Sequence, residues 1–245
     1  MTTLGEYFLG SHDPFWVILP DTLTTLDNFA LNSRGESRFE EIFIPHSVTK
    51  LGMNPFRYCF KLAAIRVDAD HPVLATIDGV LFDKTEKKLI CYPCAYTATE
   101  YTVPWGVKAI GDFAFTDSYS LERIDLNGVS SIGKVAFGGC YALKEIYIPE
   151  NVTEIPEAAF AGCMALESVY LPSGLKSIGE AAFEGCYSLR EIAIPASVTY
   201  IHEDAFSVFN VIVSIQVERD SYAAQWCREN RMPYHYPDSD AWLDE

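Results

Sequence analysis

Apolar and polar positions along the chain repeat with a period of about 23 residues. The segment 146–168 returns almost unchanged as 169–191. A period of this length is typical of a solenoid, in which each coil contributes one short strand and one return segment. A single coil cannot bury its apolar face alone, so the sequence predicts coils that stack on their neighbours. The phenylalanine of each repeated unit recurs at steps of 22 or 23 residues, at Phe115, Phe137, Phe160, Phe183 and Phe206.

Each unit contains the alternation expected of a short strand. Within residues 166–172, alternation directs Val169 and Leu171 inward and leaves Tyr170 on the outer face of a sheet. Proline then ends the strand, because it cannot donate to a ladder of hydrogen bonds. In the return half, a turn glycine precedes one short helical or 3-10 turn that places Phe183 in the core.

The consensus Leu-x-x-Ile-x-Ile-Pro-x-x-Val-x-x-Ile-Gly-x-x-Ala-Phe-x-x-Cys resembles the BspA-type leucine-rich repeats of bacterial proteins, over roughly residues 15–232. The resemblance implies an α/β repeat solenoid, a right-handed coil with a parallel concave β-sheet and short helical or 3-10 turns on the return side. It also implies a non-enzymatic role in adhesion or protein binding, often at the bacterial surface. The departures are modest: Asn127 replaces the strand-ending proline, Ser118 replaces the cysteine, and the first coil lacks the Ala-Phe pair.

The repeat is interrupted between Val67 and Tyr101. Two β-rich runs, 77–82 and 89–93, flank the polar turn 83–88, and this arrangement predicts a β-hairpin. We therefore expect one leucine-rich-repeat domain over residues 1–245, divided into an N-terminal cap (1–16), repeats (17–67), the hairpin insertion (68–100), further repeats (101–217) and a capping helix with an acidic tail (218–245).

Both ends of the chain have the composition of caps, which a repeat array needs over its terminal apolar faces. Near the C-terminus, Asp220 or Ser221 can cap a helix that runs to about Arg231 and is stopped by Pro233. At the N-terminus, the apolar side chains expected to cover the first coil are Tyr7, Phe8, Phe15 and Trp16.

Composition excludes several kinds of partner. Lys and Arg total 18 against 34 for Asp and Glu, a formal net charge of −16. This balance repels phosphate backbones, so we expect no nucleic-acid partner and a basic partner rather than an acidic one. Apolar runs are shorter than the roughly 20 residues of a membrane-spanning helix, so no membrane insertion is expected. Without a visible signal peptide the expected location is cytoplasmic, or the cell surface or secreted if the chain is a trimmed fragment.

The sharpest isolated chemical motif is the pair Cys91 and Cys94, because Cys-x-x-Cys can be a redox pair or half of a zinc site. A redox pair normally lies at a helix N-terminus, and His71 is the only other plausible metal ligand nearby in sequence. Asp68 and Asp70 begin like a calcium loop, but later positions lack the required Gly and Glu. We therefore favour two structural residues of the hairpin over a thiol or metal function, and we expect no catalytic residues, metal or cofactor.

A second set of cysteines follows the repeat. Cys140, Cys163 and Cys186 occupy the same position in successive units. Free cysteine is among the most buried residue types, so this column predicts buried thiols that pack in the core.

The outward positions of the sheet are the best candidate for a binding surface, because they vary while the inward ones hardly change. The repeat places Tyr147 and Tyr170 side by side with Glu145 next to them, and aromatic anchors inside a polar rim are typical of binding sites. The alternatives are a solvated sheet on which tyrosine merely favours strands, and a spacer without a dedicated ligand. We expect a protein, peptide or glycan to bind this concave face. Its candidate residues are Phe43, Arg66, Arg123, Asp125, Glu145, Tyr147, Tyr170 and Glu191.

Overall fold

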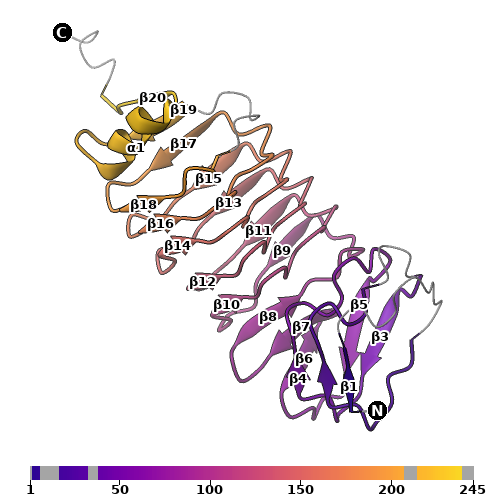
Figure 1. Cartoon of the computed structure of the whole chain (residues 1–245). Coiled ribbons are helices and arrows are strands. Elements are labelled where there is room, and N and C mark those ends of the chain that lie inside the picture. The colour runs from indigo at the N-terminus through magenta and orange to yellow at the C-terminus, as the bar shows by residue number, and fades with distance from the viewer. Residues whose placement is uncertain (1, 6–16, 33–37, 207–213, 239–245) are drawn as a thin grey trace.

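The computed structural model describes residues 2–5, 17–32, 38–206 and 214–238. Its coils stack along one axis from the N-terminal strand β1 to helix α1 (Figure 1). Strands of two to four residues form two parallel ladders, one on each side of the stack. The longer strands are β3 (Glu41–Ile44), β5 (Ala64–Val67), β9 (Glu100–Thr102), β11 (Arg123–Asp125), β13 (Glu145–Tyr147), β15 (Ser168–Tyr170), β17 (Glu191–Ile194) and β19 (Ser214–Val217).

The second ladder, here called the short-strand ladder, is built from the return segments. Its strands are only two residues long, because each contributes a single inward apolar residue and one outward neighbour. They are β1 (Thr3–Leu4), β2 (Thr25–Leu26), β4 (Lys50–Leu51), β10 (Ala109–Ile110), β12 (Ser131–Ile132), β14 (Glu154–Ile155), β16 (Ser177–Ile178) and β18 (Tyr200–Ile201).

The core confirms the 23-residue period. Strand β13 pairs with β15 in the register Tyr147 with Tyr170, one period apart. Inside the stack, the five phenylalanines from Phe115 to Phe206 form a continuous column, with ring centroids 5.1–5.5 Å apart and interplanar angles of 6–15°. Tyr92 extends this column at one end, 4.9 Å from Phe115, and Trp226 closes it 6.1 Å from Phe206.

The return segments differ from the predicted helical or 3-10 turns. They are hydrogen-bonded turns in which alternate amides bond to the next coil: the N–H of Phe160 donates to the carbonyl of Ala182 at 2.9 Å, whereas the N–H of Ala161 donates locally to the carbonyl of Ala158 at 3.0 Å. Because every second amide bonds between coils, a continuous run of helical hydrogen bonds cannot form. Left-handed residues such as Ala158 (φ 52°) and Gly162 (φ 75°) further prevent a helix. Among the described residues, the single α-helix is α1 (Tyr222–Asn230).

The insertion contains the predicted hairpin and one more strand. The predicted hairpin is β7 (Val80–Asp83) with β8 (Lys88–Cys91), and β6 (Leu74–Ile77) precedes them in an antiparallel meander. The predicted run 77–82 began too early, because its first residue ends β6. The additional turn is made by Asp78 and Gly79, both with positive φ. An Asp-Gly pair is a strong two-residue hairpin signal, so the sequence did contain the information for β6.

The same insertion joins the two parts of the array. Strand β8 pairs in parallel with β10 and so becomes part of the short-strand ladder. Along β7, Val80 and Phe82 pack into the hydrophobic cluster that extends to the C-terminus, whereas Leu81 packs into the N-terminal cluster. The insertion is therefore a layer whose two faces belong to different cores.

The predicted C-terminal helix is confirmed. Its N-cap is Ser221, whose side chain accepts from the N–H of Ala224 at 3.1 Å, and its C-cap is Arg231. Strand β20 (Tyr234–His235) was not predicted, and it pairs with β19 as a further rung. In the predicted acidic tail, Asp238 forms an ion pair with Arg219 at 3.1 Å. The expected N-terminal covering residues Tyr7, Phe8, Phe15 and Trp16, and the tail beyond Asp238, lie outside the described residues.

Candidate interaction surface

The outward side chains of the longer strands form the surface that we call the long-strand face. The structure pairs its positions as the repeat predicted, for example Glu145 with Ser168 and Tyr147 with Tyr170. Hydrogen bonding divides the sheet into three parts, β3–β5, β9–β15 and β17–β20. The candidate residues are divided in the same way: Phe43 and Arg66 on the first part, Arg123, Asp125, Glu145, Tyr147 and Tyr170 on the second, and Glu191 on the third.

Tyr147 and Tyr170 form a stacked aromatic pair at the centre of this face. Their ring centroids are 4.1 Å apart with an interplanar angle of 7°. The two residues nevertheless keep 58% and 47% of their surface exposed. A hydrogen bond to the Tyr170 side chain raises the pKa of Tyr147 above its ordinary value. The pair is therefore a rigid, accessible apolar platform with hydroxyl groups at its rim.

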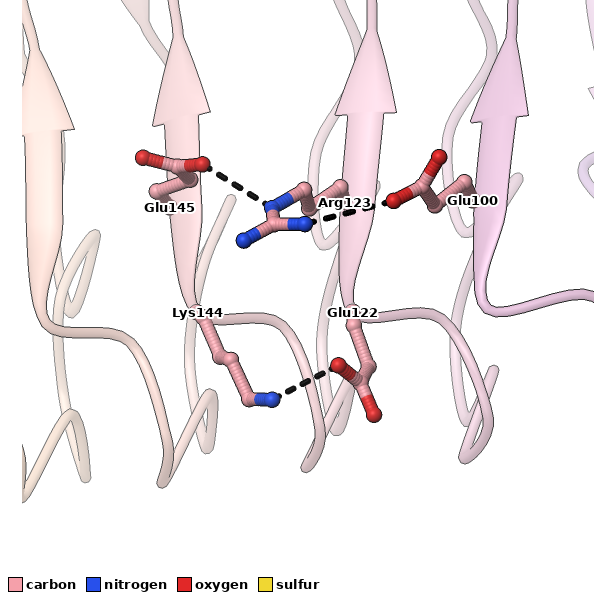
Figure 2. Close-up of polar contacts among 5 residues, drawn as sticks. All are labelled: Glu100, Glu122, Arg123, Lys144 and Glu145. Carbon is pink, nitrogen blue, oxygen red and sulfur yellow. Dashed lines mark hydrogen bonds and ion pairs between the residues drawn. The ribbon is translucent and has the colours of Figure 1, made fainter.

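A row of charged side chains borders the platform. Figure 2 shows Arg123 between two carboxylates, with Nε 3.1 Å from Oε1 of Glu145 and Nη1 3.3 Å from Oε1 of Glu100. In the adjacent row, Lys144 pairs with Glu122 at 2.6 Å. These groups lie at the surface, exposed or half-buried, so the pairs add little to the stability of the fold. Their main effect is to fix the positions of charges that a partner would meet.

A shallow hollow of about 220 Å³ lies next to the platform. Arg123, Asp125, Glu145 and Tyr147 contribute to its wall together with strand β9. Asp125 is held in place because its carboxylate accepts from the N–H of Asn127 at 2.8 Å. Four of the eight candidate residues thus surround one depression.

The remaining candidates lie apart from this hollow. Phe43 is 47% exposed on β3, and Arg66 on β5 forms an ion pair with Glu41 of β3. Glu191 lies 3.3 Å from Nε2 of His235, which β20 brings next to it. Among the outward residues of the longer strands, β3 to β19, the charged side chains are five carboxylates and two guanidiniums, so the long-strand face is acidic overall. They are Glu41, Glu100, Asp125, Glu145 and Glu191 against Arg66 and Arg123.

Cys91 and Cys94 are held as structural thiols. Cys91 is buried, and Sγ of Cys94 donates to the carbonyl of Cys59 at 3.0 Å. Burial raises the pKa of Cys91 well above its ordinary value and raises the pKa of Cys94 to about 12. Both are protonated at neutral pH, whereas a thiolate is the form that attacks and binds metals. The Nδ1 atom of His71 accepts from the N–H of Leu74 at 3.0 Å, so backbone contacts already use this ring nitrogen.

The repeated cysteines are buried, as predicted, and each makes the same contact between coils. Sγ of Cys140 donates to the carbonyl of Phe115 at 3.1 Å, and Sγ of Cys163 donates to that of Phe137 at 3.1 Å. Cys186 repeats the contact with Phe160 at 3.2 Å. The column is therefore explained by packing and by a weak hydrogen bond to the preceding coil.

One group of side chains could hold a divalent cation. His46, Asp68 and Asp70 are exposed, and one ligand atom from each lies within 4.8 Å of the others. Only the two aspartates are close in sequence; His46 comes from the preceding coil and approaches them through the pairing of β3 with β5. Exposed groups of this kind are common without a bound ion, and the pair His46 and Asp70 already interacts at 3.8 Å.

Among the described residues, no helix is both long and apolar enough to cross a bilayer.

Comparison with known proteins identifies the repeat. Residues 2–103 and 90–213 match the BspA type leucine rich repeat region, in six copies. The chain belongs to the BspA-type leucine-rich repeat family. Proteins with this repeat are commonly interaction or adhesion modules and are generally non-enzymatic.

Solved structures of bacterial proteins support the assignment of this BspA-type protein. A leucine rich cell surface protein from Faecalibacterium prausnitzii is 33% identical, with a TM-score of 0.80 over 92% of this chain and 59% of that one. A leucine-rich repeat protein from Eubacterium ventriosum is 27% identical, with a TM-score of 0.63 over 84% and 68% of the two chains. The pneumococcal vaccine antigen PcpA shares the fold, at 24% identity and a TM-score of 0.75 over 87% and 59%.

The BspA-type chain thus spans 59% of the length of the Faecalibacterium relative. No curated protein sequence matches it.

Proposed function

We propose that this BspA-type protein is a non-enzymatic interaction module that binds a protein, peptide or glycan along its long-strand face. The observation that carries the proposal is the stacked pair Tyr147 and Tyr170, which remains exposed although its ring centroids are only 4.1 Å apart. Rigid aromatic groups lose little side-chain entropy on binding and present a large apolar area. Peptide side chains and the apolar faces of sugars both suit such a platform.

The charges around the platform favour a basic partner. Glu100 and Glu145 flank Arg123, and Asp125 lies on the same hollow, so the rim carries more negative than positive charge. Complementary charge mainly accelerates association and excludes wrong partners. Association with a basic partner should therefore slow as salt is raised, since the Debye length falls to about 8 Å at 0.15 M ionic strength.

We also propose that the protein acts at the cell surface. The Faecalibacterium relative is described as a cell surface protein, and this supports the surface over the cytoplasmic location expected from the N-terminal sequence. Treatment of intact source cells with protease tests the location. A surface protein is degraded while a cytoplasmic marker survives, and survival of both proteins would contradict the proposal.

The binding face is tested with the double variant Tyr147→Ser and Tyr170→Ser. Wild type and variant are screened against a glycan array and a displayed peptide library, and hits are quantified by biolayer interferometry. We expect hits to weaken at least about tenfold, which corresponds to about 1.4 kcal/mol. Tyr200→Ser is the matched control, because Tyr200 is 50% exposed but lies on the short-strand ladder.

Two outcomes would contradict the binding proposal. Hits that bind wild type and the double variant equally would place binding elsewhere on the molecule. Complete absence of hits with both libraries would favour the alternative that the protein is a structural spacer without a dedicated ligand.

The thiol alternative has its own test. Because the pKa of Cys94 is raised to about 12, we expect slow alkylation of the native protein by iodoacetamide at pH 7.5, and fast alkylation after denaturation. Elemental analysis of the purified protein checks the metal arm of the alternative. Rapid native alkylation of Cys91 or Cys94, or stoichiometric zinc, would revive a redox or metal function.

A further inference from the structure

A second row of exposed apolar side chains lies away from the long-strand face, in the turns that follow each return segment. Its members directly follow Ser118 or a column cysteine in four consecutive coils. The rings of Tyr119 and Tyr141 are stacked, with centroids 5.4 Å apart. The four members have exposed fractions of 40–46%: Tyr119, Tyr141, Met164 and Tyr187.

A groove of about 400 Å³ runs beside three of these side chains, Tyr141, Met164 and Tyr187. Its lining includes Gly139 and Gly162, which have φ of 70° and 75°. At the next glycine, Gly185, an added Cβ would meet the backbone of Gly162 at 3.3 Å. The floor is thus bare backbone because both conformation and close coil packing require glycine.

The groove contains two carboxylates, one from the first and one from the last of these four coils. Asp117 is half-buried, and burial raises its pKa above the ordinary value. Glu184 is exposed on the last of the four coils. The cation in the lining is Arg57, and its guanidinium lies over the rings of Tyr58 and Phe113 at 4.5 and 4.3 Å. The end of the groove near Glu184 therefore combines a carboxylate with exposed aromatic and thioether groups.

These groups are the chemistry that recognises a lysine or arginine side chain. A cation is attracted to the face of an aromatic ring, and a nearby carboxylate adds charge complementarity. Coils repeat about every 4.8 Å, so three steps between the first and last coil give a length of about 14 Å, or about four residues of extended peptide. The dimensions and charges match a short extended segment better than a single ion.

From these observations we infer that the groove between Asp117 and Glu184, walled by Tyr141, Met164 and Tyr187, is a second docking surface and binds an extended peptide segment carrying lysine or arginine side chains. This surface is separate from the long-strand face and does not depend on the function proposed for it.

The test uses fluorescence anisotropy with a labelled hexapeptide of alternating Arg and Ser, at about 0.15 M salt to suppress unspecific attraction to the acidic protein. The groove variant combines Glu184→Gln with Tyr187→Ser. The matched control combines Glu154→Gln with Tyr200→Ser, which removes the same groups at exposed positions of the short-strand ladder. We expect the groove variant to weaken binding at least about tenfold and the control by less than about twofold.

Further measurements distinguish binding in the groove from general charge attraction and from binding on the long-strand face. Thermal melts of both variants confirm folding, since all four replaced side chains are exposed. Equal weakening by both variants would show that charge alone attracts the peptide and would overturn the inference. It would also be overturned if wild type fails to bind, if a Glu-Ser hexapeptide binds as well, or if Tyr147→Ser with Tyr170→Ser abolishes binding while the groove variant does not.

Discussion

The regular coils and the insertion reach the same backbone arrangement by different means. In the coils from Phe115 to Phe206, each position is occupied by the same kind of residue one period later, and the rings form one column. In the insertion, consecutive residues Leu81 and Phe82 pack into different hydrophobic clusters. Yet β8 continues the short-strand ladder by pairing with β10. The stack therefore tolerates an irregular layer as long as both faces of that layer are apolar.

The difference concerns how far a local change spreads. A side chain in the column contacts the equivalent side chains of two neighbours, so its loss affects both adjacent coils. A side chain of β7 contacts one cluster only, because successive residues of a strand point to opposite faces. Mutations in the insertion should therefore separate the two halves of the array.

The largest effect is expected from Phe160→Ala. Phe160 is buried between Phe137 and Phe183, and its removal leaves a cavity that the stacked coils cannot close. We expect a loss of about 3–5 kcal/mol in the free energy of unfolding, measured by urea denaturation. A loss below about 1 kcal/mol would mean that the column is not a main source of stability.

The insertion is tested by comparing Leu81→Ala with Phe82→Ala. Each should cost about 2–4 kcal/mol, because both side chains are buried. Hydrogen exchange should distinguish them: Leu81→Ala should increase exchange in β3 and β5, and Phe82→Ala should increase it in β9 and β11. Identical exchange patterns would contradict the assignment of the two faces to separate cores.

A smaller effect is expected at the turn between β6 and β7, which was not predicted. Gly79 has φ of 83°, and an added Cβ would lie 3.0 Å from Cβ of Ala64. Gly79→Ala should therefore cost about 1–2 kcal/mol. Gly128→Ala is the control, since nothing lies within 4 Å of an added Cβ there and its stability should change by less than about 0.5 kcal/mol. Equal losses of stability at the two glycines would mean that the turn between β6 and β7 does not require glycine.

The smallest effect is expected where one coil departs from the cysteine column. Within the part of the chain that the structure describes, the hydroxyl of Ser118 is buried without a hydrogen-bond partner, whereas Cys140 donates to the coil before it. Ser118→Cys should raise stability by about 0.5–1 kcal/mol, because the larger thiol fills the same position with a lower desolvation cost. Thermal denaturation checks the sign, and a lower melting temperature would show that the position requires the smaller hydroxyl.

Most of the coil architecture could be predicted because residues one period apart in the sequence pack against each other in the stack. The 23-residue spacing is sufficient to place Tyr147 beside Tyr170 and Phe160 beside Phe183. Strand β20 could not be predicted in this way, since Tyr234 and His235 follow a helix and belong to no repeat. The return turns differ from the prediction because a short apolar sequence does not reveal that alternate amides bond to the next coil.

The candidate surface was predicted less completely. The repeat predicted Arg123 and Glu145 on one face, but only side-chain geometry shows that the guanidinium of Arg123 bridges the carboxylates of Glu145 and Glu100 (Figure 2). The sequence pattern does not predict the groove near Tyr187, because the residues that line it fall in turns, where exposed side chains are ordinary. The ion pairs of individual side chains and the groove between turns thus required the structure, although the period alone placed neighbouring residues side by side.

Closure of the stack by Trp226 has a consequence for how such proteins change in length. Because helix α1 covers the last ring of the column, growth at that end would first have to displace it. An in-frame duplication of one repeat among the interior coils meets no such obstacle, because the new rung finds matching donors, acceptors and rings above and below. Variation in height within this architecture should therefore arise by copying interior units, each adding about 5 Å while both extremities stay unchanged.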